Sequence, residues 1–302
     1  MSHFGLIIMA GREGEGNHAF LSVKSLKNER EINNYYRCLD ELGEGDYGKT
    51  YEVEHVSNGR RYAMKVQQFE RVAPGAVVTQ WSNPHEGVRK IYKEMVILHR
   101  ILPRHRNIIE LKDLLMSDNT VYMVLELCAR KNLSHFYPIA NNRSGSRIFK
   151  QIVEATHFIH QHGVLHMDLH ADNILFTDDT MTESKIIDFG LSVYKPALAV
   201  RVHANFNHLE WFNIDEVSGR RNDNSVPQDD IEALGEILHC ILAGTDVGAE
   251  SDEEELTLDE QEPRMDIFDQ QAMDLLELIG PEDFRRGALP TMYQILSHPW
   301  LA

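Results

Sequence analysis

Apolar residues recur along this chain at spacings of three and four in three separate stretches, which is the period of a helix with one buried face. The first stretch runs from Glu86 to Leu102, the second from Arg147 to His160 and the third from Asp229 to Ile241. Gly163, just beyond the second stretch, marks the end of that helix. The pattern therefore predicts three amphipathic helices, and helices dominate the prediction from Leu133 onward.

Short apolar runs between turn residues predict strands. Two of these runs lie at Arg61–Gln67 and Val121–Cys128, and a third is read at His105–Ile109. Two shorter runs follow at Ile174–Phe176 and Lys185–Ile187. Each run is too short for a helix with a buried face, so we expect each to pair within a sheet.

Composition and charge narrow the class of protein. With 302 residues, 42% of them hydrophobic, the chain is long enough for a sizeable core and fits one large domain or two lobes. Its formal net charge of −17 favours basic protein partners and argues against nucleic acid and anionic membrane surfaces. Cys38, Cys128 and Cys240 are widely spaced and indicate neither a disulfide framework nor a zinc site. We therefore expect an intracellular protein, cytoplasmic or nuclear.

The first 35 residues are read as an extension without a core of its own. The apolar run Phe4–Ala10 lacks a basic flank and is far shorter than the roughly 20 residues that span a bilayer. We expect neither a signal peptide nor a membrane anchor there. Gly11, Gly14 and Gly16 do not have the order of a nucleotide-binding loop, so this segment is assigned no chemistry.

The stretch His166–Asn173 carries the polar pattern around which the rest of the chain is organised. Asp168 precedes the carboxamide of Asn173 by five positions, and a second carboxylate, Asp188, follows an apolar run. A loop that leads into a short strand can hold an acid and an amide side by side, and the glycine after Asp188 allows a sharp turn. Two carboxylates and an amide would form an oxygen-rich pocket, which suits Mg²⁺ and the phosphates that accompany it.

Three glycines between two strand-like segments form a second candidate site. They lie at positions 43, 45 and 48 within the run Leu42–Thr50, where the backbone could approach phosphates closely and offer N–H groups to them. Such a triplet alone is as often a plain hairpin turn. Lys65, on the next predicted strand, could reach the same phosphates, whereas a lone strand lysine is normally solvated.

The order of five motifs resembles that of the eukaryotic protein kinase family. These motifs are the glycine loop, Ala63-x-Lys65, the helical Glu94, His166-x-Asp168-x-x-x-x-Asn173 and Asp188-Phe189-Gly190. The resemblance covers the chain from about residue 36 to the end and implies an α+β, two-lobed fold. A small β-rich N-lobe with one main helix would occupy about 36–127, and a larger, mostly helical C-lobe about 132–302.

The resemblance implies an ATP- and Mg²⁺-dependent protein kinase that transfers the γ-phosphate of ATP to Ser or Thr hydroxyls of protein substrates. Asp168 would act as the catalytic base, Asn173 and Asp188 would hold Mg²⁺, and Lys65, fixed by Glu94, would hold the α- and β-phosphates. The other residues that would contact the nucleotide are Leu42, Gly43, Glu44, Gly45, Asp46, Tyr47, Gly48, Lys49 and Thr50, with Glu126 and Cys128 of the inter-lobe linker for the adenine ring.

The resemblance also assigns residues that support the site. Leu125 would guard the back of the nucleotide pocket, and Asp230 would tie down the catalytic loop from the third helix. Asp229 is read as the N-cap of that helix. The segment Tyr293–Trp300 matches the closing helix of protein kinases, and the acidic run Glu250–Glu262 is read as a solvated loop.

Four positions depart from the family's pattern. Met167 replaces an arginine that binds a phosphorylated activation loop in many kinases, which argues against control through that residue. His170 stands where Ser/Thr kinases carry a lysine near the γ-phosphate, and an imidazole would neutralise less charge there. Leu209 and Asp215 replace a threonine and a proline on the side that binds the peptide.

Two alternatives stay open from the sequence alone. These four departures motivate a pseudokinase scaffold that binds nucleotide without turnover. The run Asp168-Leu169-His170 resembles the loop of aminoglycoside and choline kinases and motivates a small-molecule phosphotransferase of kinase-like fold, whereas Phe189 and the glycine triplet argue against it. The sequence specifies neither the substrate protein nor the oligomeric state.

Overall fold

The computed structural model describes residues 23–45, 48–68, 86–117, 120–137, 139, 141–200, 224–244 and 267–302. Several expectations lie outside these ranges, namely those for the run at 4–10, for Asp46, Tyr47, Leu209 and Asp215, and for the acidic run at 250–262. Within the described ranges, no helix combines the length and the apolar character that a bilayer crossing requires.

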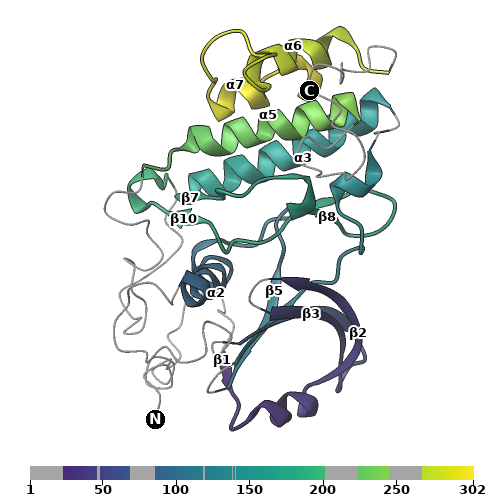
Figure 1. Ribbon diagram of the computed structural model, residues 1–302, viewed down its shortest axis with the longest axis vertical. Coiled ribbons are helices and arrows are strands. Elements are labelled where there is room, and N and C mark those ends of the chain that lie inside the picture. The colour runs from purple at the N-terminus through teal and green to yellow at the C-terminus, as the bar shows by residue number, and fades with distance from the viewer. Residues whose placement is uncertain are drawn as a thin grey trace, which may run out of the picture.

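A six-stranded sheet forms one half of the molecule (Figure 1). Its strands, in the order in which they pair, are β1 (Val23–Ser25), β5 (Leu111–Met116), β6 (Thr120–Leu125), β4 (Arg61–Gln68), β3 (Gly48–His55) and β2 (Tyr36–Gly45). All neighbouring strands run antiparallel except β1, which pairs parallel with β5. All six residues of β6 are buried because this strand lies inside the sheet and both of its faces are covered.

The strand predicted at His105–Ile109 is wrong. Only Ile108 makes an isolated bridge, and the strand begins at Leu111 instead. Asn107 sits in a turn there: its backbone N–H donates to His105 Nδ1 and its carboxamide donates to the carbonyl of Ser184. These bonds between side chains and backbone compete with a strand ladder and hold the segment in a turn.

One face of the sheet packs against α2 (Glu86–Val96), which lies within the stretch Glu86–Leu102 that was predicted to be helical (Figure 1). Ile91 and Met95 of this helix are buried in the main core, and the helix continues into a π-helical turn at Ile97–Ile101. Tyr36, Val53 and five other buried residues form a second, smaller core on the opposite face. Both faces of the sheet are therefore covered by the chain's own residues.

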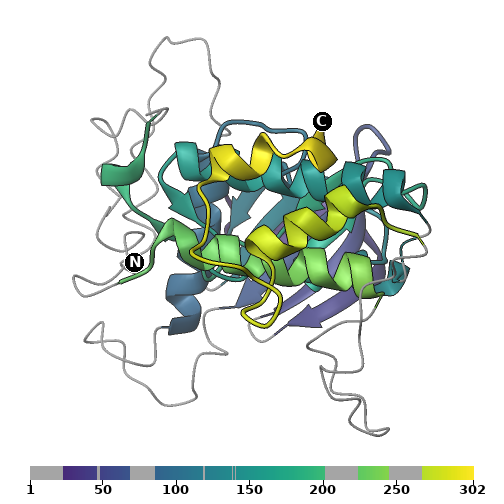
Figure 2. The ribbon, with the colours of Figure 1, turned by 90° about the horizontal axis from the view of Figure 1, so that it is seen from above.

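The other half of the molecule is mostly helical. Its helices are α3 (Asn142–Gln161), α5 (Pro227–Ala243), α6 (Gln270–Ile279) and α7 (Met292–Leu296), followed by a 3₁₀ turn at Pro299–Leu301. The long helices α3 and α5 lie side by side, and α6 and α7 cover them on the side away from the sheet (Figures 1 and 2). Gly163 follows α3 with a φ of +75°, a left-handed conformation that glycine adopts freely, so the predicted helix end is confirmed.

Asp229 has a different role at the start of α5 from the one predicted. The N-cap residue is Val226, and Asp229 lies three residues inside the helix. Its carboxylate accepts a hydrogen bond from the Val226 N–H at 2.8 Å. Pro227 between them occupies the first helical position, where its missing N–H costs nothing. The Asp229 carboxylate therefore still accepts a hydrogen bond from a backbone N–H at the start of the helix, although Asp229 itself lies in the first turn.

Two small antiparallel pairs lie between the sheet and the helices and position the loops of the site. The first joins β7 (Val164–Leu165) to β10 (Val193–Tyr194), and the second joins β8 (Ile174–Phe176) to β9 (Ser184–Ile186). The loop His166–Asn173 lies between β7 and β8, and Asp188 lies between β9 and β10. Because both connections are short, the two polar segments are held beside each other.

The described part of the predicted extension packs on the sheet. Lys24, in β1, forms an ion pair with Asp113 in β5, and the Tyr36 hydroxyl donates to the same carboxylate at 2.9 Å. Leu26 is 4% exposed and belongs to the smaller core. The 3₁₀ helix Glu29–Asn34 contributes Ile32, which packs against the same core. Residues 23–35 thus have no core of their own, yet they complete the core of the domain that follows.

We predict that a chain beginning at residue 36 is less stable than one beginning at residue 23. Removing residues 23–35 exposes the edge of β5, opens the site of Leu26 and leaves the buried Asp113 carboxylate without its cation. The expected loss in the free energy of unfolding is about 3–5 kcal/mol, from one lost leucine side chain and one unpaired buried charge. Urea denaturation of both chains measures it, with Lys24→Met in the longer chain isolating the charge. Equal midpoints for both chains would contradict the account.

Candidate active site

A cleft of about 640 Å³ lies between the sheet and the helical half. Its walls come from β2, β3 and β4, from α2, from the segment after β6, and from the loops around β8 and β9. This volume lies within the range of pockets that hold small molecules and cofactors. Each of these segments contributes residues that the sequence assigned to one nucleotide site.

Lys65 and Glu94 meet at the back of this cleft. Side chains of β4 alternate, so Met64 and Val66 pack toward the smaller core while Lys65 faces α2. The Lys65 Nζ lies 2.7 Å from Glu94 Oε2 and 3.5 Å from Asp188 Oδ2. Burial opposes the charged form of Lys65, but Glu94 and Asp188 outweigh it and raise the pKa of the lysine. The ammonium therefore stays charged and is held between two carboxylates.

Asp168 and Asn173 are in direct contact. The Asn173 carboxamide Nδ2 lies 2.8 Å from the Asp168 carbonyl oxygen and 3.1 Å from its carboxylate Oδ2, so the amide closes the loop on itself. Asp168 lines the cleft, whereas Asn173 is 8% exposed and lies behind it. The neighbouring imidazole of His170, whose Nε2 lies 3.8 Å from the carboxylate, lowers the pKa of Asp168 against the opposing effect of burial. The carboxylate is therefore ionised at neutral pH.

Asp230 holds the segment that leads to Asp168. Its carboxylate is 1% exposed and accepts hydrogen bonds at 2.8 Å from the backbone N–H groups of His166 and Met167. The imidazole of His160, on α3, lies 2.7 Å from the same carboxylate. Met167 has a φ of +65°, a left-handed conformation that costs energy in a residue with a side chain. The expected role of Asp230, to tie down this loop, matches these contacts.

Asp188 is fixed by its neighbours in the chain. Its φ is +59°, and its Oδ1 accepts the Gly190 N–H at 3.1 Å. Phe189 is fully buried and lies edge-on to His166, with 5.0 Å between ring centroids. The Ile187 N–H donates to the Asn173 carbonyl oxygen at 3.0 Å. Burial of Phe189 therefore anchors the turn that directs the Asp188 carboxylate into the cleft.

The glycine triplet forms a hairpin over the cleft. The residues that line the cleft from this hairpin are Leu42, Gly43, Glu44, Gly45, Gly48 and Thr50. A Cβ on Gly48 would lie 1.9 Å from the Val66 carbonyl oxygen, so only glycine permits the close approach of β3 to β4. The side chain of Lys49 does not line the cleft: it pairs with Glu41 and Glu44, because neighbouring side chains on a strand point to opposite faces.

The segment after β6 runs along the cleft and carries free backbone groups. The Glu126 N–H donates to the Glu110 carbonyl oxygen at 3.0 Å, and the Ala129 N–H donates to Phe176 at 2.8 Å. Among the described residues, no hydrogen bond uses the Glu126 carbonyl or the backbone of Cys128. Both residues line the cleft, with Leu125 behind them. A planar heterocycle that offers both a donor and an acceptor would satisfy these groups.

Comparison with known families assigns the fold. The profile described as "Protein kinase domain" matches residues 36–301, which is most of the chain. The chain belongs to the protein kinase family. The predictions of this family and of a two-lobed fold, with a sheet-rich first part and a helical second part, are therefore confirmed.

Individual relatives of this kinase are distant. Calcium-dependent protein kinase 8 of Arabidopsis thaliana is 32% identical over 243 residues, which cover 76% of this chain and 41% of that protein. Calcium-dependent protein kinase 14 of the same plant is 29% identical over 291 residues, which cover 90% of this chain and 50% of that protein. The hormonally up-regulated neu tumor-associated kinase of Homo sapiens is 32% identical over 173 residues, covering 56% and 22%. The chain therefore spans half of the length of calcium-dependent protein kinase 14 and less than half of the length of calcium-dependent protein kinase 8.

The kinase cleft includes residues that the sequence reasoning did not single out, among them Gln67, Lys90, Arg130, Leu175 and Ile187. Gln67 follows Lys65 by two positions on a strand, and Lys90 precedes Glu94 by four on a helix, so each shares a face with a predicted residue. The periodicities of the strand and the helix could therefore have identified Gln67 and Lys90 from the sequence. The other three reach the cleft only through the arrangement of separate segments.

His170 lies beside Asp168 and Asn173. Its Nε2 is 2.9 Å from Asn173 Nδ2 and 3.8 Å from Asp168 Oδ2, and its Nδ1 is 3.8 Å from Asp172 Oδ2. The imidazole therefore contacts the loop that carries Asp168. Whether it replaces a lysine that neutralises the γ-phosphate stays a prediction.

We predict that the stability of this kinase falls as the pH falls below about 6.5, partly because of His166. Burial lowers the pKa of His166, and the opposing effects of Asp230 and the Ile187 carbonyl do not restore it. Its Nε2 lies 3.0 Å from that carbonyl oxygen, and its buried Nδ1 has no partner among the described residues, so a second ring proton would be unsatisfied. The unfolded chain takes up this proton near the ordinary pKa and the folded chain does not, so acid favours unfolding.

For one such group, the expected loss between pH 7.5 and 5.5 is at most about 1.4 kcal/mol in the free energy of unfolding. Urea denaturation of the wild-type protein and of His166→Phe at both pH values measures the contribution. The variant should be less stable at pH 7.5 but lose less stability on acidification. Parallel losses in the two proteins would exclude His166 as a source.

Proposed function

We propose that this chain catalyses the ATP-dependent phosphorylation of Ser or Thr hydroxyls in protein substrates. The observation that carries the proposal is the convergence of the Lys65–Glu94 ion pair, Asp168 and Asp188 on one cleft. Membership of the protein kinase family supports it, and two of the relatives are themselves named protein kinases. The closing run Leu296-Ser297-His298-Pro299-Trp300 favours Ser and Thr over Tyr as acceptors.

The nucleotide would lie with its adenine ring against the segment Glu126–Cys128 and its phosphates under the glycine hairpin. The unused Glu126 carbonyl and Cys128 backbone suit the donor and acceptor on the edge of adenine. Lys65, charged and within reach of Asp188, would neutralise the α- and β-phosphates. Gly43, Gly45 and Gly48 leave room for the hairpin backbone to come close to those phosphates.

Mg²⁺ fits the residues beside the phosphate end. Among the described residues, no three His, Cys, Asp or Glu side chains are grouped to hold a metal on their own. Mg²⁺ at nucleotide sites is commonly held by one or two carboxylates together with phosphate oxygens, so Asp188 and the carboxamide oxygen of Asn173 suffice. When bound, the ion would offset the negative charge of the phosphates.

Asp168 would orient the attacking hydroxyl. Its carboxylate is ionised and lines the cleft, and the Asn173 amide fixes its direction. The hydroxyl oxygen forms a bond to the γ-phosphorus while the bond from that phosphorus to the β–γ bridging oxygen breaks, which releases ADP. The hydroxyl proton passes to Asp168. Lys65 remains protonated throughout and balances the charge on the phosphates.

The substrate and the compartment follow from charge and cysteine content. A net charge of −17 favours basic protein substrates, whose approach this charge would accelerate. The three cysteines are free thiols in the structure, in keeping with a reducing cytoplasmic or nuclear setting. Both statements belong to the proposal.

We predict that Asp168→Asn lowers phosphorylation of a basic protein such as myelin basic protein by about 100-fold or more, because a positioned general base contributes 10²–10⁴-fold. Transfer of label from γ-labelled ATP measures it, with Asp178→Asn as the matched control. Among the described residues, the Asp178 carboxylate accepts hydrogen bonds only from Thr180, in an exposed turn, so its variant should keep wild-type activity. Label that survives in Asp168→Asn would remove Asp168 from its role. ATP-dependent thermal stabilisation without turnover over a wide panel of proteins would instead identify a scaffold.

A further inference from the structure

A buried lysine stands behind the segment Glu126–Cys128 and has no part in the proposed reaction. Lys185, in β9, is 5% exposed. A buried ammonium is costly unless a carboxylate and hydrogen bonds compensate for its lost hydration. The Lys185 Nζ lies 2.9 Å from Glu126 Oε1 and 3.6 Å from Glu183 Oε1. Its main partner is thus the residue whose carbonyl faces the adenine end of the cleft.

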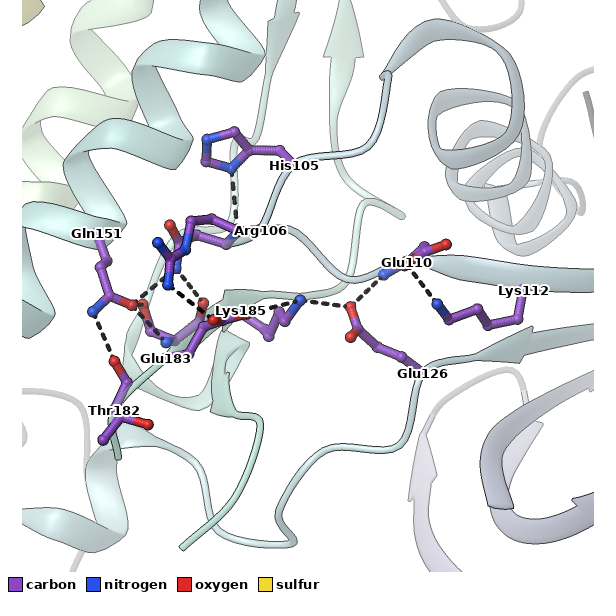
Figure 3. A network of polar contacts seen from close by, with 11 residues as sticks. His105, Arg106, Glu110, Lys112, Glu126, Gln151, Thr182, Glu183 and Lys185 are labelled. Carbon is purple, nitrogen blue, oxygen red and sulfur yellow. Dashed lines mark hydrogen bonds and ion pairs between the residues drawn. The ribbon is translucent and has the colours of Figure 1, made fainter. Parts of the chain in front are cut away.

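Glu126 is held on its other side by β5 and the turn before it. The Glu126 Oε1 accepts the Glu110 N–H at 2.8 Å, and the Glu126 N–H donates to the Glu110 carbonyl oxygen. Figure 3 shows the Glu126 carboxylate between Lys185 and Glu110. Two hydrogen bonds to the backbone of Glu110 and one ion pair with Lys185 therefore fix Glu126.

The strand that carries Lys185 is tied to the helical half. Gln151, on α3, accepts hydrogen bonds from the Ser184 N–H at 2.8 Å and from Asn107 Nδ2 at 2.9 Å. Its Nε2 donates to the Thr182 carbonyl oxygen at 3.0 Å (Figure 3). The strand β9 is thus bonded on one side to α3 and, through Lys185, on the other side to Glu126.

The same short strand leads to the metal end of the cleft. Asp188 follows Lys185 by three residues, and the Ile187 N–H between them donates to Asn173. Ile186 exchanges backbone bonds with Asn107 and Ile109 at 2.9 and 3.0 Å. The strand that carries the cation holding Glu126 therefore leads directly into the turn that carries the carboxylate assigned to the phosphate end.

We propose that Lys185 is a positioning residue for purine binding. By holding Glu126, Lys185 keeps the backbone that would contact adenine at a fixed distance from Asp188. The adenine ring and the phosphates of one nucleotide would then be bound at the same time. This inference rests on the proposed function, since it assigns a purpose to the adenine end of the same cleft. A purely structural lysine would support the fold without favouring the purine over the phosphates.

The experiment compares the binding of adenosine and of magnesium tripolyphosphate by titration calorimetry, and KM and kcat for ATP, in wild type and Lys185→Met. Loss of a hydrogen bond to a charged group predicts a rise of about tenfold or more in the Kd of adenosine and in the KM for ATP. The Kd of tripolyphosphate and kcat should stay within about twofold. Glu126→Gln should give the same pattern, and the double variant should be no worse than either single variant.

Lys185→Arg retains the charge and should restore most of the affinity. Lys112→Met is the matched control, because Lys112 pairs with Glu110 one strand away and does not touch Glu126. Unchanged adenosine binding in Lys185→Met, or equal losses for adenosine and tripolyphosphate, would overturn the proposal. Should Lys185→Met fail to fold, Glu126→Gln alone decides, since it keeps the shape of the side chain.

The adenosine measurement also separates this inference from the proposed function. A wild-type protein that binds adenosine but phosphorylates nothing would overturn the kinase activity, while the shift in adenosine affinity would still decide the role of Lys185. A wild-type protein that binds neither adenosine nor ATP would overturn both.

Discussion

The ion pair between Lys65 and Glu94 is the contact on which the site depends, because it joins the sheet to α2 at the back of the cleft. The Glu94 side chain is only 3% exposed, so its carboxylate cannot exchange Lys65 for solvent. Removing one partner of a buried pair commonly costs 3–5 kcal/mol, since the other charge is left buried and unpaired. The pair thus fixes where α2 lies against β4. It also places a lasting positive charge 3.5 Å from Asp188, where phosphates would enter.

The same physical rule recurs at the other loops of the cleft. Asp230 is buried and is satisfied by two backbone N–H groups and His160, which fixes the path of the chain into Asp168. Lys185 is buried and is satisfied by Glu126, which fixes the segment at the other end of the cleft. In each case a buried charged side chain on one helix or strand binds a loop that belongs to another part of the chain. Each of these buried charges favours the arrangement of the loops that satisfies it.

The sequence predicted the local features well. Helical periodicity located α2, α3 and α5 because one face of each helix is buried, and the order of motifs identified Lys65, Glu94, Asp168 and Asp188 as neighbours in the cleft. It failed where partners far apart in the chain decide the outcome. The β1 strand exists because it pairs with β5, and Lys24 finds its counter-ion 89 positions away. Lys185 reads as an ordinary strand lysine until Glu126 is placed behind it.

The wrongly predicted strand at 105–109 and the direction of the Lys49 side chain both have local causes. The carboxamide of Asn107 offers the backbone an alternative to a ladder, which hydrophobic pattern alone does not reveal. Lys49 lies inside the right motif, but the alternation of a strand turns its side chain toward Glu41 and Glu44. A motif identifies the backbone that approaches a ligand. The direction of each side chain follows from the pleat.

The most direct test of the account is a crystal structure of the protein with Mn²⁺ and a non-hydrolysable ATP analogue. The account predicts adenine against the backbone of Glu126 and Cys128, the Lys65 ammonium in contact with the α- and β-phosphates, and the metal between the phosphates, Asp188 and Asn173. A nucleotide bound elsewhere on the protein, or a metal that touches neither Asp188 nor Asn173, would contradict it.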